Sequence, residues 1–119
     1  MKDPKSKCRN EKTVFDGIKF DSKLECERYK FLKQRQERGM IRDLRVHVTF
    51  PIIEKSKHGR QIKYVCDFSY MDCVSGRTIV EDVKSPYTAK LPVYRLKKRL
   101  FAEKYHIEIT EVFSKWQQN

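Results

Sequence analysis

The clearest chemical signal in the sequence is an aspartate and a lysine separated by one residue, Asp82 and Lys84. They end the run IVEDVK over residues 79–84, whose composition predicts a β-strand. Because side chains alternate along a strand, both project to one face, with Cα atoms about 7 Å apart, while Glu81 projects to the other. A carboxylate placed beside an ammonium group can hold a divalent cation while the lysine orients water or neutralises developing charge.

A second aspartate, Asp67, lies inside the apolar run YVCDF over residues 64–68. Burying an unpaired carboxylate is costly, and a bound cation would remove that cost. If the two strands pair through a turn near residues 75–76, Asp67 and Asp82 become cross-strand neighbours. Neighbouring carboxylates repel unless they share a cation or a proton, and oxygen ligands suit Mg²⁺ or Mn²⁺. The alternative is an ordinary cross-strand pair of each acid with lysine or arginine.

Glu25 is a third acid with two competing interpretations. Residues 22–25 (SKLE) fit a capping box, in which the glutamate reaches back to the N-cap amide. The other interpretation places Glu25 on the helix face that looks onto the sheet, where it would complete the metal site. The local sequence does not separate the two.

Composition narrows the class of protein. The chain has 119 residues, enough for one domain, and a net charge of +11, which favours a polyanionic partner such as nucleic acid. An acidic protein or an anionic lipid surface would also fit that charge. No apolar run reaches the roughly 20 residues of a membrane span, and the polar N-terminus is unlike a secretory signal, so we expect a cytoplasmic protein.

Cysteines and histidines show no spacing typical of a metal or catalytic site. Their positions do not form C-x-x-C pairs, so we interpret the cysteines as reduced thiols, with Cys26 and Cys66 as small apolar core residues. The histidines have no paired spacing and receive no role: His47, His58 and His106.

The predicted elements place these acids on one domain over residues 13–119, preceded by a flexible basic arm over residues 1–12. Asp16-Gly17 predicts a hairpin over residues 13–20, because both central residues of a type I′ turn need positive φ. Periodicity predicts helices over residues 22–38, ended by Gly39, and over residues 92–105. Strands are expected over residues 44–52, 61–71 and 78–84 as an antiparallel meander, and over residues 107–112 as a parallel addition.

Basic side chains near the predicted site are candidates for DNA contact. They lie after Lys84 on the second helix, and around the start of the first helix: Arg95, Lys97, Lys98, Lys19 and Lys23. Contacts of this kind to phosphates fix position without reading sequence. A solvated helix face is the simpler alternative.

The order of these acids resembles the PD-(D/E)XK nuclease superfamily. Residues 20–25 (FDSKLE), 80–84 (VEDVK) and 94–98 (YRLKK) are similar to a bacteriophage family of uncharacterised and Holliday-junction-resolvase-like proteins. The resemblance covers residues 14–113. It implies an α/β (α+β) fold with an αβββαβ restriction-endonuclease-like core, a central mixed sheet flanked by helices. Two departures are Cys66, where the motif name has proline, and an aspartate in place of the commoner glutamate at position 82.

The resemblance also assigns roles. Glu25, Asp67 and Asp82 match the metal-binding acids, and Lys84 matches the motif lysine. It implies a Mg²⁺- or Mn²⁺-dependent endodeoxyribonuclease, phage-encoded and acting in the bacterial cytoplasm on branched, Holliday-junction-like DNA. By the same analogy we expect a homodimer without a small-molecule cofactor. The rival hypothesis is a non-catalytic, basic nucleic-acid-binding module.

Overall fold

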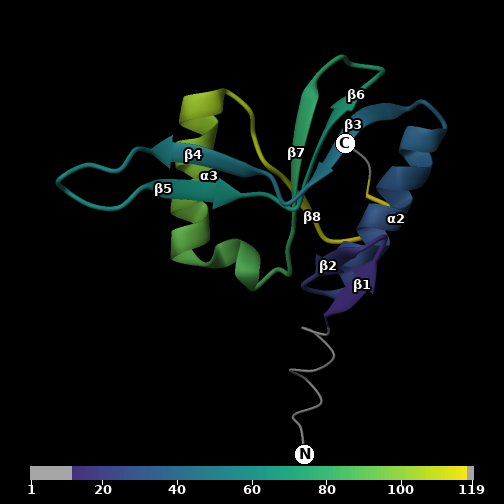
Figure 1. Ribbon diagram of the computed structural model, residues 1–119, viewed down its shortest axis with the longest axis horizontal. Coiled ribbons are helices and arrows are strands. Elements are labelled where there is room, and N and C mark those ends of the chain that lie inside the picture. The colour runs from purple at the N-terminus through teal and green to yellow at the C-terminus, as the bar shows by residue number, and fades with distance from the viewer. Residues whose placement is uncertain (1–11, 118–119) are drawn as a thin grey trace, which may run out of the picture.

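A mixed four-stranded sheet forms the centre of the computed structural model, which describes residues 12–117 (Figure 1). The predicted basic arm over residues 1–12 lies, except for Lys12, outside the described residues. Within the sheet β7 and β8 are parallel, and the other pairs are antiparallel. Its strands are, in spatial order, β3 (Ile41–Val46), β6 (Phe68–Asp72), β7 (Thr78–Val83) and β8 (Thr110–Val112).

One helix lies on each side of this sheet, as predicted: α2 (Lys23–Glu37) and α3 (Pro92–Tyr105) (Figure 1). Along the chain, the helices and the strands of the central sheet follow the order α2, β3, β6, β7, α3, β8, which confirms the expected αβββαβ sequence of elements. The fold is therefore of the mixed α/β class. Within residues 12–117, neither helix has the length and apolar character to cross a lipid bilayer.

The start and end of α2 follow from local chemistry. The Ser22 hydroxyl accepts from the Glu25 amide at 3.0 Å, and Gly39, at φ +77°, adopts the left-handed conformation after the last turn. The preceding hairpin joins β1 (Thr13–Phe15) to β2 (Ile18–Phe20). Asp16 and Gly17 both have positive φ, 55° and 73°, as a type I′ turn requires.

The prediction of two continuous strands over residues 44–52 and 61–71 is wrong. The first breaks at His47, whose φ is +56°, and the second breaks at residues 66–67. The outer halves, β4 (Thr49–Ile53) and β5 (Ile62–Val65), pair as a separate hairpin that leaves the central sheet beside α3 (Figure 1). Backbone hydrogen bonds from the His47 amide to the Asp67 carbonyl, and from the Cys66 amide to the Val48 carbonyl, span the break.

Two apolar clusters, one under each helix, explain the break. The cluster under α2 takes Phe68 and Tyr70 from β6, whereas the cluster under α3 takes Ile52 from β4 and Tyr64 from β5. A straight strand cannot bury one half of its length under each helix without a change of direction. The sequence pattern showed alternation but not which helix each half would cover.

The C-terminal strand is shorter than predicted. Only Thr110–Val112 forms β8, against the expected residues 107–112, although its parallel pairing with β7 is confirmed.

Pro92 occupies the first turn of α3 as predicted, and His106 at φ +59° ends the helix. A short 3₁₀-helix, η1 (Thr88–Lys90), connects β7 to α3. This connection carries the chain over the end of the sheet at which Lys84 lies.

Candidate active site

Asp67 lies at the break between β5 and β6, immediately before the first residue of β6. The register pairs Phe68 with Glu81, which places Asp67 opposite Asp82, as the sequence predicted. The Asp67 carboxylate accepts a hydrogen bond from the Val83 amide at 2.7 Å, and the Asp67 amide donates to the Glu81 carbonyl at 3.1 Å. The strand break therefore fixes the Asp67 carboxylate against the end of β7.

Asp82 is only 5% exposed and is surrounded by polar groups of mixed sign. The Tyr64 hydroxyl donates to its Oδ2 at 2.7 Å, and Lys84 Nζ lies 3.6 Å from the same oxygen. Burial, the hydrogen bond that protonated Asp82 donates to the Asp67 carboxylate and the charge of Asp67 raise the pKa of Asp82 to about 7. The pKa of Asp67 is also raised, to about 6, chiefly by burial and by the charge of Glu25. The two carboxyls thus titrate as a coupled pair that holds a proton near neutral pH.

Glu25 reaches the same cluster from the first turn of α2. Its carboxylate lies 2.8 Å from His47 Nε2, and ligand atoms of Glu25, His47 and Asp67 all lie within 4.8 Å of one another. The Ser22 hydroxyl caps the Glu25 backbone amide, but within residues 12–117 no hydrogen bond joins the Glu25 carboxylate to the Ser22 amide. The structure therefore contains the serine half of the capping box, and the glutamate side chain, 4% exposed, faces His47 and Asp67.

Lys84 lies at the edge of the cluster, beside Tyr94 of α3 and Glu111 of β8. Its Nζ lies 4.1 Å from the centre of the Tyr94 ring, a cation–π geometry. The Tyr94 hydroxyl donates to Glu111 Oε2 at 3.0 Å, and burial and nearby acids raise the Tyr94 pKa. Burial opposes ionisation of Glu111, but hydrogen bonds from Lys98 and Tyr94 lower its pKa. Tyr94 therefore holds the Lys84 ammonium in place without neutralising it.

The donor set fits a divalent cation. Asp67 belongs to two groups of side chains. It faces Glu25 and His47 on one side and Asp82 on the other. Carboxylates suit Mg²⁺ and Mn²⁺, and an imidazole adds affinity for Mn²⁺ or another transition metal. A cation at Asp67 would take the place of the proton that the Asp67–Asp82 pair otherwise shares.

The predicted DNA-contacting residues fall in two places. Arg95, Lys97 and Lys98 lie on α3, where Lys98 pairs with Glu111 at 3.0 Å and Arg95 is exposed. Lys19 on β2 and Lys23 in the first turn of α2 are exposed, at the end of the helix that carries Glu25. The first group therefore follows the Lys84 side of the cluster, and the second follows the Glu25 side.

Sequence reasoning missed three members of this region: His47, Tyr64 and Glu111. His47 received no role because its position in an alternating run gave no sign of the strand break that directs it toward Glu25. Tyr64 is a buried core residue, as its sequence context suggested, but its hydroxyl also reaches Asp82. Glu111 could have been found from register, because parallel pairing of β7 with β8 sets it beside Asp82.

The fold and the site define a mixed α/β domain that gathers acids from a helix, a strand break and a strand end. The chain belongs to the family described as "Protein of unknown function (DUF1064)", whose model matches residues 5–117. Among curated proteins and among solved structures, no significant match to the chain was found.

Proposed function

We propose that the protein is a metal-dependent endodeoxyribonuclease that uses Mg²⁺ or Mn²⁺ to hydrolyse phosphodiester bonds. One observation carries the proposal: Asp67 lies between Glu25 and His47, whose ligand atoms are within 4.8 Å of its own, and Asp82, which has Lys84 Nζ 3.6 Å away. Nothing in folding requires buried acids to face one another, because their mutual repulsion destabilises the native state. A cation-dependent reaction gives the arrangement a purpose.

The chain's own groups have distinct roles in this reaction. Glu25, Asp67 and Asp82 would hold the cation, which when bound polarises a phosphoryl oxygen and lowers the pKa of water. Lys84, held over the Tyr94 ring, orients the attacking water or stabilises charge on the phosphate in the transition state. The Val83 amide and the Tyr64 hydroxyl keep the two aspartates in position.

The order αβββαβ and the matched motif residues support membership of the PD-(D/E)XK nuclease superfamily as part of this proposal. By the same resemblance we propose branched recombination or replication intermediates as substrate and a homodimer as the working form. A phage-encoded enzyme acting in the bacterial cytoplasm fits that substrate. The net charge of +11 supports a nucleic-acid partner.

The test is cleavage of branched, duplex and single-stranded DNA by the purified protein with Mg²⁺, with Mn²⁺ or with chelator. We expect metal-dependent cutting, lost in Asp82→Ala and lowered on the order of 100-fold or more in Lys84→Ala. Matched controls are Asp43→Asn and Lys57→Ala, exposed residues of β3 and the β4–β5 loop, which should cut normally.

Binding measurements separate this proposal from a non-catalytic nucleic-acid-binding module, which the basic composition also fits. A module binds DNA and cuts none of the substrates with either metal. A nuclease retains DNA binding in Lys84→Ala while cutting falls, because one of many phosphate-facing cations is lost. The melting temperature gives a second readout: Mg²⁺ or Mn²⁺ should raise it for the wild type and not for Asp82→Ala.

A further inference from the structure

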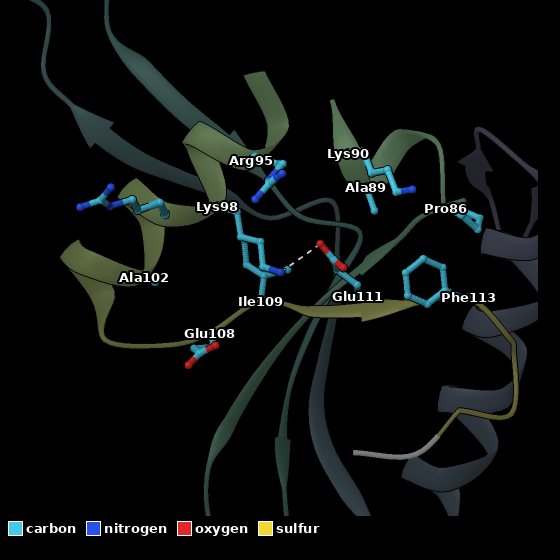
Figure 2. A pocket seen from close by; sticks show the side chains of 11 residues that line it. Pro86, Ala89, Lys90, Arg95, Lys98, Ala102, Glu108, Ile109, Glu111 and Phe113 are labelled. Carbon is cyan, nitrogen blue, oxygen red and sulfur yellow. Dashed lines mark hydrogen bonds and ion pairs between the residues drawn. The ribbon is translucent and has the colours of Figure 1, made fainter. Parts of the chain in front are cut away.

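A separate hollow of about 690 Å³ lies between η1, α3 and β8 (Figure 2). Its size falls within the range of small-ligand sites. One wall is apolar, and Figure 2 shows Phe113 at one end of β8 and Ile109 at the other, with Ala89 opposite on η1. Phe113 is 46% exposed, so its ring is accessible to a ligand in the hollow.

The other lining residues are mainly cationic. Four basic side chains face two acids, Glu108 and Glu111. Lys98 is paired with Glu111, whereas the remaining three make no ion pair or side-chain hydrogen bond within residues 12–117. They are Lys90, Arg95 and Arg99. A pocket with an apolar wall and unpaired cations has the chemistry to bind an aromatic, anionic ligand.

This pocket adjoins the carboxylate cluster. Asp82 and Glu111 are register partners on the parallel strands β7 and β8, whose backbones lie about 4.8 Å apart, so their side chains share a face of the sheet. Glu111 lines the pocket, and Tyr94 links it to Lys84. A ligand in the pocket therefore lies next to whatever occupies the cluster.

We infer that the pocket binds one unpaired nucleotide that neighbours the phosphate held at the carboxylate cluster. The base would lie against Phe113 and the apolar wall, and its phosphate would contact Arg95 and the neighbouring cations. A base that is stacked and paired in a duplex cannot enter such a hollow, whereas an unpaired base can, and base–aromatic stacking accepts any sequence. The inference rests on the proposed function and deepens it, because it makes unpaired nucleotides the feature that selects the substrate.

The test is to measure, by fluorescence anisotropy, how the full chain binds DNA in the presence of chelator, where no cleavage occurs. The probes are a perfect duplex, the same duplex with a three-nucleotide unpaired flap, and that flap made abasic. We expect the flap to bind on the order of 10-fold more tightly than the duplex, with the preference lost when the flap is abasic. Phe113→Ala should remove the preference for the flap while leaving duplex affinity within about 2-fold, and Arg95→Ala, which also removes a phosphate-contacting charge, should weaken flap binding more than duplex binding.

Lys97→Ala is the matched control, since it removes a charge from the same helix but outside the pocket. It should weaken binding to all three probes equally. Equal affinity of the wild type for flap, abasic flap and duplex would overturn the inference, as would an intact flap preference in both pocket variants. Flap preference without cutting under any metal would instead refute the proposed function, and cutting without flap preference would refute this inference alone.

Discussion

Glu81 and Asp82 are consecutive residues of β7 that face opposite sides of the sheet, and their surroundings differ in one respect. Glu81, on the α2 side, receives hydrogen bonds from Arg28 at 2.8 and 2.6 Å and another from the Tyr70 hydroxyl. Asp82, on the α3 side, faces Asp67, and Lys84 Nζ, 3.6 Å from the Asp82 carboxylate, opposes their charge. Both acids are nearly inaccessible, at 0% and 5% exposure.

The comparison separates structural acids from chemically poised ones. Arg28 also donates to the carbonyls of Lys115 and Gln117, so the Glu81 pair ties α2, β7 and the C-terminal residues together. That pair has full charge compensation and holds elements in place. The Asp67–Asp82 pair lacks such compensation and keeps a proton that a cation could replace. Burial alone would not have distinguished the two.

Breaking the compensated pair should have the largest effect on stability. Arg28→Met leaves Glu81 buried without its cation, and we expect the free energy of unfolding to fall by about 3–5 kcal/mol. Urea unfolding followed by circular dichroism measures it. If the pair is structural, the double variant Arg28→Met/Glu81→Leu should recover most of the loss, because the buried charge is gone.

Lys30→Met is the matched control for this prediction. Lys30 lies on the same helix and pairs with Glu27 at 3.3 Å, but both side chains are substantially exposed. Its loss should cost about 0.5 kcal/mol or less. Similar costs for Lys30→Met and Arg28→Met would remove the distinction between the two faces of β7.

The uncompensated pair should make stability rise as pH falls. Because the pKa of Asp82 is about 7 in the folded state and lies near 4 when unfolded, the native state binds more protons between these values. In chelator, lowering the pH from 8 to 5.5 should therefore add about 2 kcal/mol from this site. Asp82→Asn should lack that gain. The comparison of the two proteins at each pH isolates the site from the other titrating groups.

If Asp82 is a structural acid, stability should depend differently on pH. A site whose carboxyls are compensated in the native state would not gain stability on acidification through neutral pH. If wild type and Asp82→Asn show parallel pH profiles, Asp82 belongs with Glu81 as a structural acid.

Much of the fold could be predicted from sequence because local rules governed it. The Asp16-Gly17 turn, the Ser22 cap, Gly39 and Pro92 fix the ends of the hairpin and both helices. The break at His47 could not be predicted, since it depends on which helix each half of a strand covers. Positive φ is uncommon for any residue other than glycine, so a histidine inside an alternating run does not by itself predict it.

The candidate site divides in the same way. Asp82 and Lys84 share a face by strand alternation, and the turn between β6 and β7 set the register of Asp67, so these three could be predicted. The side-chain direction of Glu25 could not, because a capping box and a site acid have the same sequence. His47 joined the cluster only through the strand break.

His47 offers a way to sharpen the comparison between the two acid pairs. If it completes a metal site, His47→Asn should raise the Mn²⁺ concentration for half-maximal cleavage by on the order of 10-fold and leave that for Mg²⁺ nearly unchanged, because imidazole favours transition metals. If instead it balances Glu25 as Arg28 balances Glu81, the variant should lose stability and respond alike to both metals. His58→Asn, in the exposed β4–β5 loop, is the control.

The smallest expected effect assigns Glu25 to one class or the other. Ser22→Ala removes the hydroxyl that caps the Glu25 amide and should cost about 1 kcal/mol in free energy of unfolding, with cleavage retained. Glu25→Gln keeps that backbone cap and should change the free energy of unfolding by no more than about 0.5 kcal/mol. Cleavage should be lost, because the charge that faces Asp67 and His47 is gone. Thermal melting and a cleavage assay on the same two preparations measure both. A Glu25→Gln protein that melts early and still cuts would make Glu25 a structural acid like Glu81, and would leave Asp67 and Asp82 as the only acids of the site.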